Sequence, residues 1–504
     1  MNLVELCLKM GLNPKSVALH QKRISEGKPD SISIKDTCRI DNGALLPYSR
    51  LKGEGPGQGY VAFVPAAGAA SRYLSIFSEI KAASQNQNND QLTAAVKQIN
   101  IDYPETKHWP LPPKLKSLFM GKTPTTLSAE DFSALEKEMA YPKALMPCTA
   151  DGATFLDIKS YEHQNLPELV GQTFVVGPAH HDVVTEYIKD NQAFKNINSQ
   201  TLVQDEGLST VRFDDNHQPI IEPSGELSMV PAGHGALTGL FLKVKESFGE
   251  AHSLFIRNID NVAGDHGEAA EAASRLMAYH NQLRNYMEQI RDGLKDGLPG
   301  RKIIRALSQE LCLNPAETFD PIQELVRIAI DGFYTPKGLV YQTSDNSEEA
   351  LRKSLRMIFN RPFNIMGQVP NTGNDVGGSA IFTDRGLGLE TFCIEVPHAS
   401  ETDKASFLAN PGKATHFNPV FCCAEIPSDP DYYEKLAEDI PWLLAKKKYA
   451  GKDVYYHETV LYEIIGSSRI ANVVFTEVPR AVFNPHKTMA DCKMLGTSSL
   501  IKNQ

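Results

Sequence analysis

The chain has 504 residues, of which 41% are hydrophobic and 22% are charged, a composition typical of ordinary globular proteins. The length corresponds to about three domains, or to one domain enlarged by insertions. The formal net charge of -10 argues against a nucleic-acid-binding protein, because such proteins gather basic residues and this chain has no long run of Lys or Arg. Any anionic substrate must therefore be met by local basic residues.

Membrane and redox signals are also missing from the sequence. No apolar stretch approaches the length that spans a bilayer, and the N-terminus has no basic segment followed by an apolar run. The 8 cysteines are scattered without paired CxxC spacing, which predicts neither a zinc site nor a disulfide framework. We therefore expect a cytoplasmic protein with no nucleic-acid partner and no membrane partner.

Strands and helices are expected to alternate along most of the chain. Residues 1–59 read as an N-terminal helical extension that ends in a glycine-rich break. Apolar strands are expected at 61–65, 173–177, 253–257, 380–383, 391–396 and 472–478. This order predicts an α/β fold with a mixed, mostly parallel sheet, helices on both faces and ligands at the carboxyl ends of the strands.

A long helical stretch lies between two groups of predicted strands along the sequence. Residues 60–266 form the first half of the predicted core, and residues 361–504 form its second half with the C-terminal segment. Between them, strong helix formers and solvated charge spacing predict a helical insertion at 267–360. We interpret the insertion as structural.

The first candidate motif is the loop of small residues that follows the strand at 61–65. Gly68 stands among alanines, so backbone N–H groups can approach an anion closely, and Ser71 and Arg72 add a hydroxyl and a guanidinium. Such a loop can wrap a triphosphate. Taken alone, the pattern fits close packing of a strand on a helix equally well.

Two further motifs combine proline or glycine with a basic residue. Lys143 stands between prolines in Tyr141–Pro147, where a restricted backbone can present its ammonium to phosphate. In Val230–Ala236, glycines bracket His234 and free the backbone to bind a base or a sugar. By itself, the lysine would be a surface residue and the glycine motif a turn.

The last two motifs supply a carboxylate and two cations. Asn258, Asp260 and Asn261 follow a buried strand, and oxygen ligands at such a tip suit Mg²⁺, which keeps several waters and bridges to phosphates. The alternative is a side-chain cap on the following turn. In the segment Glu477–Asp491, Arg480 and Lys487 flank an extended stretch and suit a polyphosphate.

In this order the motifs resemble those of the UDP-sugar pyrophosphorylases, which have a glycosyltransferase-A-type (Rossmann-like) core. The matching segments are Ala66–Arg72, Pro142-Lys143, Pro231–Gly235, Asn258–Asn261 and Val478–Asp491. Most of the chain also resembles an uncharacterised bacterial family, domain of unknown function 4301, with Thr415–Val420 as a further shared block. The chain departs from the pyrophosphorylases at Ala236, where they have Asp, and in the longer spacing between the loop and Pro142-Lys143.

The resemblance implies a magnesium-dependent transfer that joins an NTP, with UTP foremost, to a sugar-1-phosphate and releases pyrophosphate. It makes Arg72, Lys143 and Lys487 the candidate catalytic residues and Asp260 the metal ligand. The implied nucleotide-binding residues are Ala66, Ala67, Gly68, Ala69, Ser71, Gly233, His234, Gly235 and Asn258. Candidates for contacting sugar hydroxyls, from polar groups at strand ends, are Asn371–Asp375, Glu395, His416 and Asn418.

Two alternatives remain from other classes of protein. A regulatory protein that binds nucleotide or sugar without turnover is favoured by Ala236 and by the displaced Lys143. A glycosyltransferase that consumes a nucleotide sugar would share the fold, but the late segment with Arg480 and Lys487 favours the pyrophosphorylase.

Overall fold

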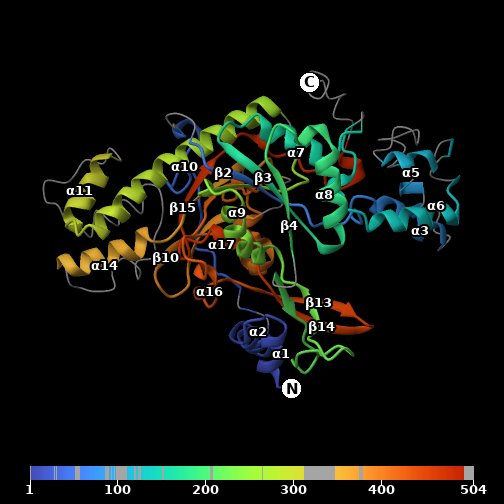
Figure 1. The fold of residues 1–504 in the computed structure, drawn as a ribbon, viewed down its shortest axis with the longest axis horizontal. Helices are drawn as coiled ribbons and strands as arrows, with labels where there is room; N and C mark the ends of the chain where they lie inside the picture. Colours follow the sequence, from blue (N-terminus) through green and yellow to red (C-terminus); the bar gives the residue numbers. More distant parts are fainter. Residues whose placement is uncertain are drawn as a thin grey trace. The chain divides into compact units, whose positions relative to one another are not determined.

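The computed structural model confirms a mixed α/β fold built around a large sheet (Figure 1). The residues described are 2–492 except 28, 30, 52–56, 86–89, 92, 96, 98–110, 119–120, 123–125, 150–151, 205–207, 264, 311–346 and 374–377. All structural statements below concern this part of the chain.

Eight strands form the main sheet, in the order β11-β8-β12-β7-β2-β3-β4, with β15 also paired to β8. Their bounds are β2 Tyr60–Pro65, β3 Leu169–Val176, β4 Ser199–Val203, β7 Ser253–Arg257, β8 Phe363–Pro370, β11 His416–Phe417, β12 Phe421–Glu425 and β15 Asn472–Glu477. The pairs β3–β4 and β15–β8 are parallel, whereas β11 and β12 run antiparallel to β8. The sheet is therefore mixed, as the sequence predicts.

The apolar strands predicted from the sequence are all present. Every residue of β7 is buried, and in β2 only Pro65 is partly exposed, as expected for strands covered on both faces. The predicted strands at 380–383 and 391–396 correspond to β9 (Ser379–Asp384) and β10 (Leu389–Ile394). These two pair antiparallel with each other and belong to a separate sheet with β1 (Asp36–Thr37).

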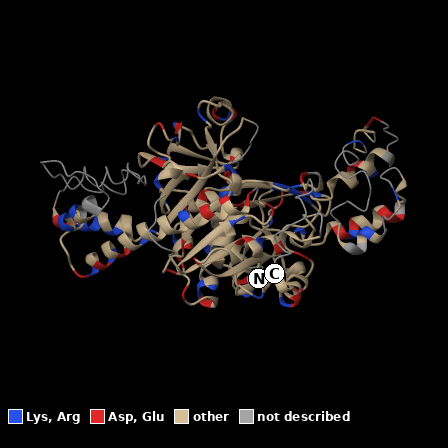
Figure 2. Ribbon diagram, turned by 90° about the horizontal axis from the view of Figure 1, so that it is seen from above, with Lys and Arg blue, Asp and Glu red and all other residues tan. Residues whose placement is uncertain are grey.

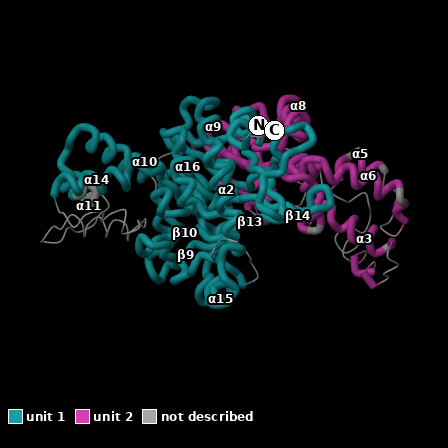
Figure 3. The backbone as a smooth tube through the Cα atoms, turned by 90° about the horizontal axis from the view of Figure 1, so that it is seen from below, with its two compact units in different colours: residues 1–61, 204–256, 271–480 teal, residues 62–203, 257–270, 481–504 magenta. Residues whose placement is uncertain are grey.

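The chain divides into two compact units, each made of discontinuous segments (Figure 3). Unit 1 comprises residues 1–61, 204–256 and 271–480, and unit 2 comprises 62–203, 257–270 and 481–504. The four segments predicted along the sequence, 1–59, 60–266, 267–360 and 361–504, are a different division and stay a prediction.

Unit 2 surrounds a core of aromatic and aliphatic side chains from its loop, helices and strands. Its helices are α3 Ser75–Gln85, α5 Pro113–Leu118, α6 Ala129–Met139, α7 Phe155–Gln164 and α8 His181–Asp190. Helix α7 begins after Thr154, whose side chain accepts from the Asp157 N–H while the Asp157 carboxylate accepts in return. This capping box fixes the start of α7 and places Phe155 in the core beside Tyr73.

Unit 1 contains the predicted N-terminal helices and most of the predicted helical stretch. Its helices are α1 Leu3–Lys9, α2 Pro14–Glu26, α9 Phe241–Ser247, α11 Gly300–Glu310, α14 Glu348–Phe359, α15 Glu401–Asp403, α16 Tyr432–Lys435 and α17 Leu461–Ile465, together with nearly all of α10, His266–Lys295. Two antiparallel ribbons complete it, β5 (Ser209–Val211) with β6 (Met229–Pro231) and β13 (Leu443–Tyr449) with β14 (Lys452–Glu458).

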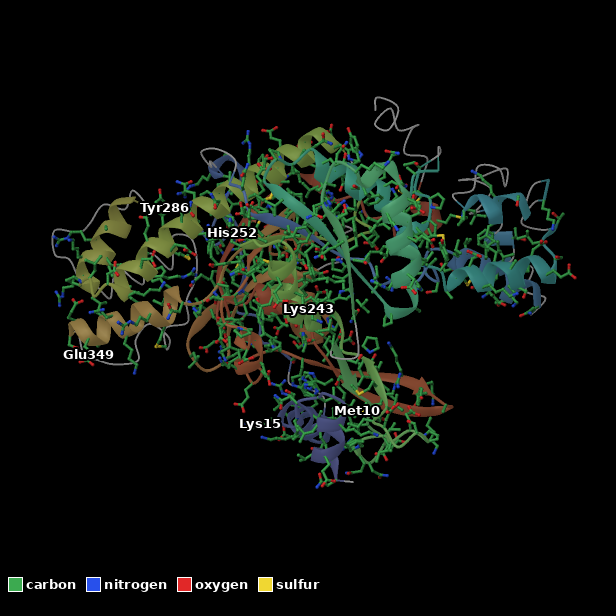
Figure 4. All side chains as sticks on the ribbon, in the orientation of Figure 1. Met10, Lys15, Lys243, His252, Tyr286 and Glu349 are labelled. Carbon is green, nitrogen blue, oxygen red and sulfur yellow. The ribbon has the colours of Figure 1, made fainter. Side chains whose placement is uncertain are left out.

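Helices α1 and α2 are anchored to the rest of unit 1 by a small apolar core. Leu6, Cys7, Val17 and Ile24 pack with residues of the two ribbons. Met10, labelled in Figure 4, accepts a hydrogen bond from the Leu227 N–H through its sulfur. The N-terminal helices are therefore part of a packed unit.

Charged residues of both signs are interspersed along the described chain (Figure 2). None of the helices in the described ranges has the length and apolar character needed to cross a membrane.

Candidate nucleotide site

The small-residue loop and the Pro-Lys motif pair directly, both within unit 2. The Lys143 N–H donates to the Gly68 carbonyl at 3.0 Å, and the Ala70 N–H donates to the Tyr141 carbonyl at 2.9 Å. Ala69 and Pro142 form an antiparallel bridge between these bonds. The long spacing that separates the two motifs in sequence therefore does not separate them in space.

The tip of this loop faces solvent. Gly68, Ser71 and Arg72 are exposed, whereas Ala66 and Ala70 are buried and hold the loop to the core. A Cβ at Gly68 would meet no atom within 4 Å, so packing within the chain does not require glycine there. The open side of the loop leaves room for an anion to approach the backbone.

The side chain of Lys143 joins three of the predicted motifs. Its ammonium donates to Asp260 Oδ2 at 2.9 Å and to the His486 carbonyl at 2.7 Å. It also lies 5.3 Å from the centroid of the Phe155 ring, within the range of a cation–π contact. Lys143 is 8% exposed, so this is a desolvated cation and not the surface lysine of the alternative interpretation.

The turn after β7 is tied to the segment that follows Val482. The Asn484 N–H donates to Asn261 Oδ1 at 2.9 Å, and the His486 N–H donates to the Asp260 carbonyl at 2.8 Å. Asn261 thus uses its side chain to hold a distant segment, while its own N–H donates to the Asn258 carbonyl. The motif Asn258–Asn261 and the segment Glu477–Asp491 therefore contact each other at this turn.

A buried ionic cluster, Lys159–Glu162–Arg257, supports the same turn. Lys159 and Arg257 both donate to the Asn261 carbonyl, and Arg257 also donates to the Val482 carbonyl at 3.2 Å. Both cations contact the Glu162 carboxylate, at 2.7 and 2.9 Å. The second Glu162 oxygen accepts from the Ala263 N–H.

Electrostatics in this cluster follow from burial and proximity. Burial lowers the pKa of Lys159 to about 8, and the charge of Arg257 acts in the same direction. Burial alone would raise the pKa of Glu162, but Arg257 and Lys159 hold it at about 2. Sequence reasoning missed these residues, because Lys159 and Glu162 on α7 read as an exposed i,i+3 pair and nothing local marks them as buried.

Lys487 and Asp491 lie at the end of the same segment. Lys487 is exposed, and its side chain has no partner among the described residues. Asp491 accepts from the Lys487 and Thr488 N–H groups at 3.0 and 2.7 Å and from the Thr488 hydroxyl. This cap fixes the backbone that carries Lys487 while its ammonium stays available.

In unit 1, the motif around His234 has a packing explanation for its glycines. Gly233 has φ 83, and a Cβ there would meet Glu458 Cγ at 2.5 Å. A Cβ at Gly235 would meet Thr459 Oγ1 at 2.2 Å, and the Gly235 N–H already donates to the Thr459 carbonyl. The Gly235 donor is therefore not free for a base or sugar, whereas His234 is exposed.

The candidate sugar residues form a second cluster in unit 1. The Asn418 N–H donates to the Gly378 carbonyl at 2.7 Å, and a Cβ at Gly378 would meet Glu395 Oε1 at 3.0 Å. His416 lies 3.4 Å from Glu477. Asn371 is described, but Asn374 and Asp375 lie outside the described residues.

Local strain accompanies this cluster. Val420 has φ 60, a left-handed conformation that costs energy for a β-branched residue, and its N–H donates to Asn418 Oδ1. The Asn418 side chain is buried against the Cys393 thiol.

Asp260 offers a metal ion one partly exposed carboxylate in the unit 2 site. The described residues contain no group of three or more His, Cys, Asp or Glu side chains that could hold a metal ion. The Asp260 side chain is 28% exposed, with one oxygen bound to Lys143. One partly exposed carboxylate fits Mg²⁺, which often takes one or two carboxylates and completes its shell with waters and substrate phosphates.

The fold is similar to that of UDP-glucose pyrophosphorylase from Leishmania major. The open and closed structures of UDP-glucose pyrophosphorylase from Leishmania major match at 15% identity with a TM-score of 0.51, over 97% of this chain and 77% of that one. A mutant of that Leishmania major enzyme in complex with UDP-glucose matches at 14% identity with a TM-score of 0.51 and the same coverage.

The chain belongs to the family described as Domain of unknown function (DUF4301), whose model matches residues 160–494. No curated protein matches it. The resemblance inferred from the motifs is thus confirmed at the level of family and fold.

Proposed function

We propose that this protein is a sugar-1-phosphate nucleotidyltransferase of the glycosyltransferase-A type, which joins an NTP, with UTP foremost, to a sugar-1-phosphate. The observation that carries the proposal is the ion pair between Lys143 and Asp260 beside the open loop at Gly68. It sets a desolvated cation and a carboxylate next to a backbone that an anion can approach.

In the proposed reaction, an oxygen of the sugar-1-phosphate attacks the α-phosphorus of the NTP. A new P–O bond forms there, the bond to the β-phosphate oxygen breaks, and pyrophosphate leaves. Such transfers need positioning and charge stabilisation more than covalent catalysis. The loop Ala66–Arg72 would bind the triphosphate, with Lys143 and Lys487 offsetting its negative charge.

We propose Asp260 as the magnesium ligand. A magnesium ion bound there would neutralise phosphate charge. Lys143 occupies one oxygen of that carboxylate and leaves the other for the ion. The cluster Lys159–Glu162–Arg257 would keep the turn that carries Asp260 in place.

The test is pyrophosphate release from purified protein with Mg²⁺, measured over a panel of NTPs and sugar-1-phosphates. We expect turnover with at least one pair, and with UTP before other nucleotides. Nucleotide binding without turnover across the whole panel would contradict the proposal.

Two observations favour a second function, that of a nucleotide-binding regulatory protein. Lys143 already neutralises Asp260, and Ala236 replaces the aspartate of the resembled family. If the ion pair persists with nucleotide bound, the site would hold the ligand without reacting. Adding Mg²⁺ together with the panel of sugar-1-phosphates to the bound nucleotide distinguishes the two, because only the enzyme transfers the nucleotidyl group to the sugar phosphate and releases pyrophosphate.

A further inference from the structure

Unit 1 contains a cavity of about 440 Å³ that no step of the proposed reaction uses. It is lined by α2, by the turn and helix around Phe241, and by the chain around α16 and the end of β14, all within unit 1. Gly235 and Ala236, from the motif around His234, contribute to one wall. None of the lining residues comes from the loop at 66–72 or from the turn at 258–261. Its volume lies within the range of small-molecule pockets, roughly 300–1,000 Å³.

A stack of aromatic rings bounds the cavity. The rings of His20 and His457, which both line it, are parallel, with centroids 4.0 Å apart and an interplanar angle of 8°. Trp442 stacks on His457 with centroids 5.0 Å apart and an angle of 12°. Because His457 covers one face of the half-buried His20 ring, the part of His20 that lines the cavity is its other face or its edge.

Arg23 fixes this stack and has few donors left. Its guanidinium contacts His457 Nε2 at 2.9 Å and donates to the carbonyls of Ala437 and Glu438 at 3.0 and 3.1 Å. Asp429 and Glu434 also line the cavity, where Asp429 pairs with Lys435 and Glu434 accepts from the Asn13 side-chain amide. An anionic ligand would therefore meet acidic residues and, in Arg23, a cation that is already engaged.

Two lining residues carry polar atoms without partners in the described part of the chain. The Tyr433 hydroxyl is buried and has no hydrogen-bond partner, which costs about 1–3 kcal/mol if nothing satisfies it. His20 uses Nδ1 toward the Thr210 hydroxyl at 3.2 Å, and no described residue bonds to its Nε2. Burial lowers the pKa of His20 to about 4, so its ring is neutral at pH 7.

We infer that this cavity binds a small uncharged aromatic or heteroaromatic molecule that extends the ring stack over His20 and hydrogen-bonds to the wall. Aromatic and aliphatic walls with a few convergent polar atoms are the usual composition of such sites. The stacked imidazole supplies the flat surface, and His20 Nε2 supplies a polar contact. None of the lining residues is Lys143, Asp260 or Lys487, the charged groups that the proposed nucleotidyl transfer uses.

Matched probes test the ligand class. Binding to the full chain is measured by ligand-observed NMR with benzamide and nicotinamide, beside benzoate as the anionic analogue and cyclohexanecarboxamide as the saturated analogue. We expect saturable binding of the first two and about tenfold weaker binding of the others, the scale of one stacking contact. No saturable binding of either uncharged ring, or equal binding of all four probes, overturns the inference.

Variants locate the site. Ser16→Phe, which fills the cavity from α2, and His20→Ala, which removes the flat surface, should each weaken benzamide binding by about tenfold or more. Lys22→Ala is the matched control, because Lys22 lies on the same helix outside the lining and is exposed. If His20→Ala fails to fold, Ser16→Phe carries the test. Binding that survives Ser16→Phe, or that UTP with Mg²⁺ displaces, overturns the inference.

Discussion

The Lys143 ammonium lies 2.9 Å from the Asp260 carboxylate, although 117 residues separate them in the chain. The backbone of each residue is fixed by a residue other than its ion-pair partner. The Lys143 N–H donates to the Gly68 carbonyl, and the Asp260 carbonyl accepts from the His486 N–H. A change at either residue should therefore affect the charge of the site more than its backbone.

Lys143→Met keeps the aliphatic stem beside Phe155 and removes the charge. If Lys143 stabilises phosphate charge in a partly desolvated site, turnover should fall on the order of a hundredfold or more. The measurement is pyrophosphate release at saturating substrates, with a thermal melt of the same protein. Lys122→Met is the control, since Lys122 pairs with Asp131 elsewhere in unit 2. Equal losses in both variants would contradict a specific role.

Asp260→Asn keeps the shape of the side chain and removes the proposed magnesium ligand. We expect the rate to fall far more than the stability, and the loss to be partly recovered at high Mg²⁺. A magnesium titration of the rate checks this. The same half-saturating Mg²⁺ concentration in both proteins would remove Asp260 from the metal site.

Glu162→Gln tests the buried cluster that holds the turn. The variant leaves Lys159 and Arg257 buried beside each other without a counter-charge, which should cost about 3–5 kcal/mol of stability. Glu136→Gln breaks the exposed pair with Lys81 in the same unit and should cost at most about 1 kcal/mol. Urea unfolding of both measures the difference, and equal midpoints would show that the cluster is not important for stability.

Much of the framework was predictable because it depends on local patterns. Apolar runs such as β2 and β7 are covered on both faces and were found from composition alone. The pairing of Gly68 with Lys143 was not predicted, since no local signal spans the intervening chain and the long spacing was interpreted as a departure from the family.

The remaining features depend on contacts that sequence reasoning could not place. Gly233 and Gly235 were interpreted as ligand-binding glycines, but the end of β14 packs against both. Lys159 is fully buried because the Glu162 carboxylate offsets its charge. The same carboxylate also pairs with Arg257, which comes from another segment of the chain. Non-local packing and charge pairing decide such positions.

Acid should destabilise unit 1 through His280. This buried ring bonds to the Tyr60 hydroxyl and the Phe363 carbonyl, and burial lowers its pKa to about 3. The unfolded chain takes up a proton near pH 6.5 while the folded histidine stays neutral, so its contribution is complete above pH 6.5 and falls as the pH drops, by about 1.4 kcal/mol per pH unit.

The measurement is urea unfolding between pH 7 and pH 5, in the wild type and in His280→Gln. We expect a smaller loss of stability over this interval in the variant, because one titrating group has been removed. Parallel pH dependences would mean that His280 does not contribute to the acid sensitivity.

Lys487→Met separates catalysis from structure, because Lys487 is exposed while its backbone is held by Asp491. An ordinary surface lysine would leave both the melting temperature and the rate unchanged when replaced. In the proposed site its ammonium offsets charge that shifts between the α-phosphate and the leaving pyrophosphate, so turnover should fall on the order of a hundredfold while the melt stays the same. Lys189→Met, at an exposed position of α8 in the same unit, is the control. An unchanged rate with saturating substrates would exclude Lys487 from catalysis, and restoration of part of the rate by Lys487→Arg would show that the positive charge itself is what the reaction needs.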